Sequence, residues 1–135
     1  MQIETTLREK GIQPSAQRVA VASYVLHTHE HPSAELVFRR VKEHFPWISR
    51  ATVYNTLNLF VEKGLLQRLT IAEDSVVFDP VTGMHHHFID EDTGAIHDVP
   101  WERVQVCNIE TLQDYDVKQY AVVMRGKLKN TKGEM

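Results

Sequence analysis

A chain of 135 residues with 42% hydrophobic and 24% charged residues has the composition of a folded protein with one ordinary domain or two small ones. No apolar run approaches bilayer length and residues 1–10 lack the apolar core of a signal peptide, so we expect a cytoplasmic protein without membrane partners. The single cysteine, Cys107, excludes an internal disulfide and a CxxC zinc site, and we expect it to be a small buried side chain.

The charge is distributed unevenly along the chain. Residues 1–78 carry nine Lys and Arg against eight Asp and Glu, a net charge of +1, whereas residues 79–135 carry six against ten, a net charge of −4. This asymmetry predicts two modules with different partners, which we place at residues 1–79 and 80–135. Because a net charge of +1 is small for a nucleic-acid binder, DNA contacts would depend on the local placement of charge and on two copies of the chain.

Four amphipathic segments before residue 64 predict helices. Ser15 and Ser49 stand where an N-cap is expected, Gly11 and Gly64 stand where a helix ends, and Pro46 stops the third segment. We expect the helices over residues 1–10, 15–27, 32–45 and 49–63. Apolar residues at helical spacing predict a core that includes Val19, Ala22, Val25, Leu26, Leu36, Val37, Val41, Phe45, Val53, Leu57 and Phe60.

After Gly64 the pattern changes to two short strands, at residues 65–71 and 75–78, with a turn-like sequence at 72–74. Helices followed by a two-stranded hairpin are the order of a winged helix-turn-helix, whose last helix enters the major groove of DNA. A polar helix face is more often only solvated. Here, however, the first two turns of the last helix cluster residues able to bond phosphates or bases, opposite the predicted core stripe. The predicted DNA contacts are Ser49, Arg50, Thr52, Tyr54 and Asn55.

A second hairpin carries most of the histidine chemistry of the chain. The sequence Glu-Asp-Thr-Gly at residues 91–94 predicts a turn, since Gly adopts a positive φ and Asp can bond its own backbone. If Asp90 pairs with Ala95, the register places His87 directly opposite Asp98.

Successive side chains of a strand alternate between its faces, so His85 and His87 share the face of Asp98, while His86 lies on the other face with His97. Three adjacent histidines are also compatible with a solvated surface run, but the register with a carboxylate favours a metal site. Nitrogen and oxygen donors without a thiolate suit Fe²⁺, Mn²⁺ or Zn²⁺ better than a structural four-cysteine zinc. The ligands predicted from the strand pattern are Asp79, just upstream, with His85, His87 and Asp98.

The end of the chain predicts a small layer that needs a partner. We expect a helix over residues 101–113, a strand over 116–128 and a frayed polar tail over 130–135. Two or three strands and one helix bury their apolar faces poorly, so the helix and the strand are expected to form a homodimer interface. The predicted fold class is α+β, with an N-terminal winged helix-turn-helix and a small C-terminal α/β dimerisation domain.

Five motifs occur in a fixed order: GIQPSAQR (11–18), HPSAELVF (31–38), SRATVYNTL (49–57), FDP (78–80) and HHHF followed by GAIHD (85–98). Together, and at this spacing, they resemble the ferric uptake regulator superfamily of bacterial metal-dependent transcription factors. The resemblance implies a homodimeric repressor of a double-stranded DNA operator, in which Tyr54 packs on thymine and Arg18 is a further DNA-binding residue. It also implies a regulatory metal site that clamps the two modules together, formed by His31, Asp79, His85, His87 and Asp98.

The departures from the family pattern narrow the resemblance. Many members of the family carry two CxxC pairs that bind structural zinc; here Asp90 and Thr93 replace the first pair and the second pair is missing, so no structural zinc is expected. In addition, Met84 and Gln105 stand where the family has ligands of an additional sensory site. This combination resembles the peroxide-sensing branch and the iron-response branch, the latter associated with heme. It implies that the protein responds to peroxide or to iron and binds Fe²⁺ or Mn²⁺, which Zn²⁺ could replace in vitro. It also implies oxidation of a ligand histidine as a candidate switch.

Other function classes fit parts of the sequence. A heme-responsive regulator would use His86, with His97, although we expect His86 to be simply exposed, and a zinc-responsive regulator would use the clamp site itself. A metal-dependent hydrolase would use the His-x-His pair and carboxylates to activate water. Five protein ligands leave little room for a substrate, however, and Glu91, the best candidate base, lies in the turn. We therefore expect a regulator and not an enzyme.

Overall fold

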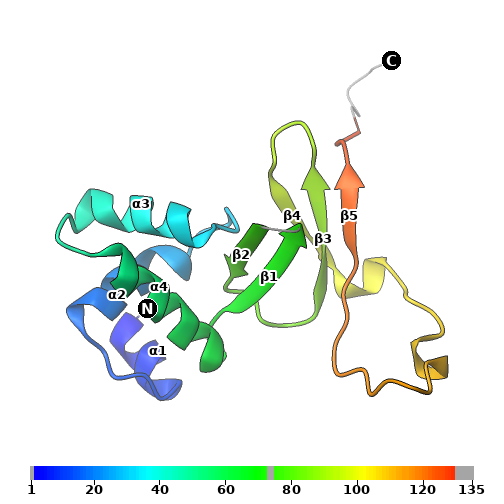
Figure 1. Ribbon diagram of the computed structural model, residues 1–135, viewed down its shortest axis with the longest axis horizontal. Helices are drawn as coiled ribbons and strands as arrows, with labels where there is room; N and C mark the ends of the chain where they lie inside the picture. Colours follow the sequence, from blue (N-terminus) through cyan, green and yellow to red (C-terminus); the bar gives the residue numbers. More distant parts are fainter. Residues whose placement is uncertain (1, 73–74, 130–135) are drawn as a thin grey trace. The chain divides into compact units, whose positions relative to one another are not determined.

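The computed structural model describes residues 2–72 and 75–129. The chain divides into two compact units, Met1–Thr82 and Gly83–Met135. The first unit carries four helices and a two-stranded sheet, and the second carries a three-stranded sheet (Figure 1). The α+β class predicted from the sequence is confirmed.

The four helices of the first unit form within the predicted segments. They are α1 (Ile3–Glu9), α2 (Ala16–Val25), α3 (Ala34–His44) and α4 (Arg50–Glu62). The side chains of Ser15, Ser33 and Ser49 each accept a hydrogen bond from the backbone N–H three residues later, which satisfies a donor that has no partner within the helix. Gly64 follows α4 with a φ of +81°, a conformation that glycine adopts without steric cost.

The core of the first unit lies among these helices. Val53, Leu57 and Phe60 of α4 are fully buried, as predicted, and each contributes about 1.5–3 kcal/mol by leaving water. In α3 the buried stripe includes Phe38, whereas Leu36, predicted to be in the core, is only half-buried. The core stripe of α3 is therefore rotated toward residues 37, 38 and 41.

The first sheet pairs β1 (Gln67–Ala72) with β2 (Ser75–Asp79) in antiparallel register, with Gln67 opposite Asp79. Leu65 and Leu66, predicted to begin the first strand, are instead buried in the turn after α4, where both backbone N–H groups donate to the carbonyl of Phe60. The predicted turn at 72–74 falls partly on Glu73 and Asp74, which lie outside the described residues.

The second unit is built on β3 (His85–Asp90), which lies between β4 (Ile96–Pro100) and β5 (Val123–Gly126) (Figure 1). β3 pairs with β4 antiparallel and with β5 parallel. The strand predicted over 116–128 is thus correct only over residues 123–126, in its C-terminal half, and the predicted frayed tail lies outside the described residues.

The helix predicted over 101–113 is wrong. Two isolated 3-10 turns, Trp101–Arg103 and Ile109–Thr111, occupy its place, with Val104 extended and Asn108 left-handed at a φ of +73°. A continuous helix would have buried Leu112, which is 45% exposed, and Cys107 is exposed rather than buried. A left-handed residue ends the α-helical hydrogen-bond ladder, and the helical spacing of the apolar residues alone did not reveal it.

Within the described part of the chain, no helix combines the length and the apolar character that crossing a bilayer requires.

Candidate metal centre and nucleic-acid interface

The hairpin of β3 and β4 has the register predicted from its turn. The backbone N–H of Asp90 donates to the carbonyl of Ala95 at 2.9 Å, Gly94 adopts a φ of +78°, and His87 lies opposite Asp98. The pleat then places His85 on the same face as His87, because alternate residues of a strand share a face. A turn and a strand period therefore bring together two histidines and a carboxylate.

Both histidines converge on one oxygen of Asp98. The Nε2 atoms of His85 and His87 lie 3.4 Å and 3.6 Å from Oδ1 of Asp98, and the two ring centroids are 4.5 Å apart. A metal ion bound at about 2.1 Å to a tetrahedral set of ligands separates those ligand atoms by about 3.4 Å. The distance from each histidine nitrogen to the carboxylate oxygen fits a shared divalent ion.

The tautomer of His85 supports the same interpretation. Its Nδ1 lies 2.8 Å from the carbonyl oxygen of Gly83, which can only accept, so Nδ1 carries the proton in this bond. In the neutral ring, Nε2 then directs a lone pair toward the Asp98 carboxylate. A backbone carbonyl that accepts from one ring nitrogen, while the other nitrogen faces a carboxylate, is the arrangement that orients many metal-binding histidines.

The first unit holds its own histidine and aspartate pair. His31 Nε2 lies 3.3 Å from Oδ2 of Asp79, the last residue of β2, and both side chains are buried. The backbone N–H of Phe78 donates to the carbonyl of Pro32 at 2.9 Å, which fixes the connector before α3 to β2 and so brings the pair together. The other oxygen of Asp79 accepts from the N–H of Val81 at 2.9 Å. The histidine that only the resemblance singled out is thus paired with a carboxylate in its own unit.

His86 and His97 do not form a second cluster. His86 was expected to be exposed, but it is fully buried, stacked on Trp101 with ring centroids 4.6 Å apart at an angle of 9°. Its Nδ1 accepts from the N–H of Val122 at 2.9 Å and its Nε2 lies 3.2 Å from the carbonyl oxygen of Val104. His97 is exposed, with its ring centroid 6.3 Å from that of Phe88.

Both ring nitrogens of His86 are therefore used within the protein, and binding heme iron through His86 would require breaking one of these bonds. The sequence pattern missed this burial because the segment 101–122, which covers the second face of β3, has little regular secondary structure.

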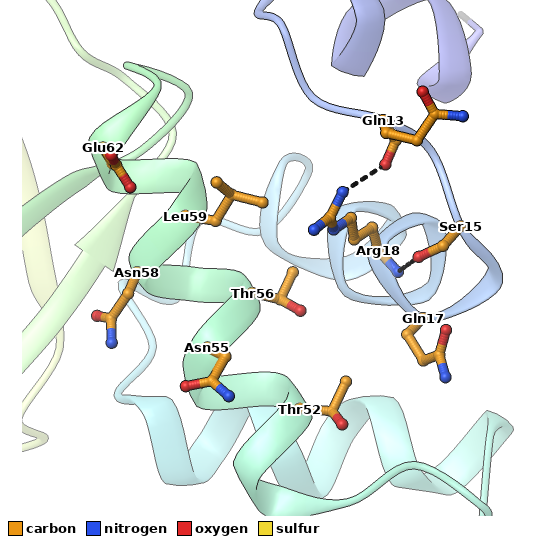
Figure 2. Close-up of a pocket in the computed structure, with 10 residues that line it drawn as sticks. All are labelled: Gln13, Ser15, Gln17, Arg18, Thr52, Asn55, Thr56, Asn58, Leu59 and Glu62. Carbon is orange, nitrogen blue, oxygen red and sulfur yellow. Dashed lines mark hydrogen bonds between the residues drawn. The ribbon is translucent and has the colours of Figure 1, made fainter.

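A polar cleft of about 690 Å³ lies between the start of α2 and α4 (Figure 2). Of the residues predicted to bind DNA, Arg18, Thr52 and Asn55 line it, and the guanidinium of Arg18 donates to the carbonyl of Gln13 at 2.7 Å. Six further polar side chains line this cleft and were not among the predicted DNA contacts. They lie on α2, on α4 and in the loop before α2, and they are Gln13, Ser15, Gln17, Thr56, Asn58 and Glu62.

The remaining predicted DNA contacts lie at the N-terminal end of α4. Ser49 caps the helix and Tyr54 is 38% exposed. Arg50 binds the carboxylate of Glu35 through two hydrogen bonds of 3.0 Å and 2.9 Å, and its guanidinium lies over the ring of Phe38. These bonds hold the pKa of Glu35 below its usual range. Arg50 is therefore already engaged by a carboxylate within its own unit, which the sequence pattern did not indicate.

Comparison with known proteins places this arrangement in a family. The sequence matches the ferric uptake regulator family over residues 9–125. The peroxide-responsive repressor PerR of Staphylococcus epidermidis is 34% identical over 133 residues, which span 96% of this chain and 87% of that protein.

Two solved structures share the fold. The ferric uptake regulator from Pseudomonas aeruginosa with manganese has a TM-score of 0.69 and 24% identity, over 96% of this chain and 100% of that one. The Campylobacter jejuni peroxide stress regulator has a TM-score of 0.68 and 24% identity, over 97% of this chain and 99% of that one. With a family match that spans most of its length and a relative similar from end to end, this chain belongs to the ferric uptake regulator family.

Proposed function

We propose that this protein is a metal-dependent transcriptional repressor that binds a double-stranded DNA operator as a homodimer. The observation that carries the proposal is the convergence of His85 and His87 on one oxygen of Asp98, with the tautomer of His85 fixed by Gly83. Membership of the ferric uptake regulator family supports it.

In this proposal a single Fe²⁺ or Mn²⁺ ion takes ligands from both units. The first unit supplies one histidine and one aspartate, and the second supplies two histidines and one aspartate, all nitrogen and oxygen donors that suit these ions. The ion stabilises the arrangement in which both sets of ligands reach it, and it raises DNA affinity by its differential affinity for that arrangement. The proposed ligands are His31, Asp79, His85, His87 and Asp98.

The two units have different roles in the proposal. Residues 1–79 bind DNA through the exposed face of α4 and the adjacent cleft, using Arg18, Ser49, Arg50, Thr52, Tyr54 and Asn55. Residues 80–135 form the dimer, because they expose large apolar side chains that a second copy would cover. The side chains that support this dimer surface are Leu112, Tyr115, Val117, Val123 and Leu128.

Peroxide is the signal that we propose, since the staphylococcal relative is a peroxide-responsive repressor. Bound Fe²⁺ supplies the redox chemistry that activates hydrogen peroxide. In the net reaction a ring C–H of a ligand histidine becomes C–OH and the second peroxide oxygen leaves as water, so that the ring loses two electrons and peroxide gains them. An oxidised ring is a poorer ligand, and loss of the ion releases DNA.

The test combines metal analysis with peptide mass spectrometry. Protein purified without chelator is analysed for bound metal, loaded with Fe²⁺ or Mn²⁺ and exposed to peroxide. The Fe²⁺ protein should gain one oxygen atom on a peptide that contains His31, His85 or His87. Fragment spectra of that peptide should show that His86, which is buried and hydrogen-bonded, is unmodified. The Mn²⁺ protein should stay unmodified. An Fe²⁺ protein that remains intact and still holds DNA after peroxide would instead identify a regulator of iron status.

A zinc-responsive regulator is the second candidate, because the same donor set binds Zn²⁺. Operator affinity measured with Zn²⁺ and with Mn²⁺ at matched free-ion concentrations separates the two readings. A response to zinc at concentrations where manganese has no effect would favour zinc as the signal.

A further inference from the structure

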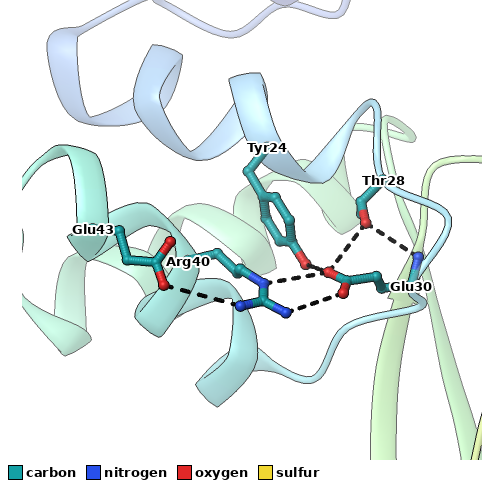
Figure 3. A network of polar contacts seen from close by, with 5 residues as sticks. All are labelled: Tyr24, Thr28, Glu30, Arg40 and Glu43. Atoms are coloured by element: carbon teal, nitrogen blue, oxygen red, sulfur yellow. Dashed lines mark hydrogen bonds and ion pairs between the residues drawn. The ribbon is translucent and has the colours of Figure 1, made fainter.

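A network of polar contacts surrounds Glu30, which lies in the connector between α2 and α3 (Figure 3). Its carboxylate accepts a hydrogen bond from the hydroxyl of Tyr24 in α2. It also accepts two from the guanidinium of Arg40 in α3, one of 3.5 Å from Nε and one of 3.1 Å from a terminal nitrogen. Thr28 adds a hydroxyl donor at 3.5 Å to the same carboxylate and accepts from the backbone N–H of Glu30 at 3.1 Å. One carboxylate thus ties the connector to both flanking helices.

The next residue in the chain is His31, and its backbone is in the left-handed region with a φ of +51°. A residue with a Cβ adopts this conformation infrequently, so the surrounding contacts must maintain it. Beyond His31, the carbonyl of Pro32 accepts from Phe78 at 2.9 Å and Ser33 caps α3. The strained residue is therefore fixed on both sides, by the Glu30 network before it and by β2 and the helix cap after it.

We propose that Glu30 and Arg40 are positioning residues for the metal ligand His31: their ion pair holds the connector in the conformation that directs the imidazole to Asp79. The inference rests on the proposed function, because it takes His31 as a ligand. Neither Glu30 nor Arg40 binds the ion. Their ion pair restricts the connector before metal binds, so that less conformational entropy is lost when His31 coordinates the ion.

The solvent exposure of the Glu30–Arg40 ion pair distinguishes a role in positioning His31 from a role in global stability. The side chains of Arg40 and Glu30 are 42% and 44% exposed, and ion pairs this accessible to water contribute little to global stability. A loss of the pair should therefore appear in metal affinity and not in the unfolding temperature. Arg40 also meets Glu43 at 4.0 Å within α3, a contact that does not reach the connector and so offers a matched control.

The experiment measures Mn²⁺ affinity of the full chain by calorimetric titration. Glu30→Ala and Arg40→Ala should each weaken Mn²⁺ binding about tenfold, at the low end of the effect of outer-sphere partners of metal ligands. Glu43→Ala should bind as the wild type does. Glu30→Ala combined with Arg40→Ala should bind no more weakly than Glu30→Ala alone, because Glu30→Ala already removes the contact with Arg40. If a variant unfolds at the measuring temperature, Tyr24→Phe, which removes one hydrogen bond, should still weaken binding about threefold.

A double-mutant cycle with His31 identifies the route of the effect. In a His31→Ala background, Glu30→Ala should cause no further loss of Mn²⁺ affinity, whereas a merely structural role would cause the same loss with or without His31. Wild-type affinity in Glu30→Ala and Arg40→Ala, or an unchanged loss in the His31→Ala background, would overturn the inference and leave the metal site standing. Unchanged Mn²⁺ affinity in His31→Ala itself would overturn the proposed ligand set and this inference with it.

Discussion

Three consecutive histidines of β3 have different surroundings because the pleat alternates them. His85 and His87 face Asp98, while His86 faces Trp101 and has both nitrogens hydrogen-bonded. The placement of His85 and His87 on one face and of His86 on the other could be predicted from the turn at residues 91–94 and from the alternation of side chains along a strand. The burial of His86 could not, because residues 101–113, which help to cover it, form two isolated 3-10 turns instead of the helix that their apolar spacing predicted.

Replacing His87 or His86 should give opposite results. His87→Ala removes a ligand held opposite Asp98 and should abolish both metal binding and the DNA response to metal. His86→Ala should retain Mn²⁺ binding but lose roughly 2–4 kcal/mol of stability, because it empties a buried site and leaves polar backbone groups unpaired. Urea unfolding and Mn²⁺ titration of both variants measure this. Loss of metal binding at wild-type stability in His86→Ala would place His86 in the metal site.

Tyr54 tests the proposed DNA face of α4. Its ring is partly exposed near the start of the helix, and Tyr54→Ala should weaken operator binding by roughly 1–3 kcal/mol if the side chain contacts a base or phosphate. Fluorescence anisotropy with labelled operator measures the loss, and unchanged Mn²⁺ affinity serves as the internal control. Equal operator affinity in the two proteins would remove this side chain from the interface.

At the scale of elements, the helices could be predicted because their ends carry capping residues. Ser15, Ser33 and Ser49 are each followed by apolar residues at helical spacing, and each caps a helix in the structure. The segment 101–113 has the spacing of a helix without such ends, and Asn108 interrupts it in a left-handed conformation. In this chain, capping residues therefore predicted the helices more reliably than the helical spacing of apolar residues did.

The turn between β3 and β4 is held by the carboxylate of Asp90, which accepts from the N–H of Asp92 at 2.9 Å and from the hydroxyl of Thr93 at 3.0 Å. The backbone hydrogen bond from Asp92, and after it the hydrogen bond from the Thr93 side chain, hold the pKa of Asp90 below its usual range. A carboxylate with a lowered folded pKa adds stability above the unfolded pKa of about 4, and the contribution is lost as pH falls through the folded value.

Asp90→Asn should therefore lower the unfolding temperature of the chelator-treated protein at pH 6, and the difference from wild type should shrink below about pH 4. Thr93→Val, which keeps the shape of the side chain and removes its hydroxyl, should give a smaller loss in the same direction. Thermal unfolding followed by circular dichroism across this range measures both. A difference between Asp90→Asn and wild type that does not depend on pH would show that the charge of Asp90 does not hold the turn.

At the scale of the whole molecule, the second unit exposes several large apolar side chains, which supports the proposed dimer surface. Tyr115 is 70% exposed and Leu128 is 59% exposed. Sedimentation at micromolar concentration with metal present should give a mass about twice 15.6 kDa. Tyr115→Asp should shift the protein toward the monomer, since it places a charge in the proposed interface, and a strictly monomeric wild type would contradict the proposed assembly.

In the proposed mechanism, one ion joins the two units and thereby controls DNA binding. Operator affinity of the wild type and of His31→Ala, measured with and without Mn²⁺, tests it most directly. The wild type should bind DNA more tightly when Mn²⁺ is added. His31→Ala should still bind Mn²⁺ through the remaining ligands, yet show little or no gain in DNA affinity, because Asp79 is then the one proposed ligand left on the first unit and the connector before α3 is no longer held by the ion. Equal stimulation by Mn²⁺ in the two proteins would contradict the account.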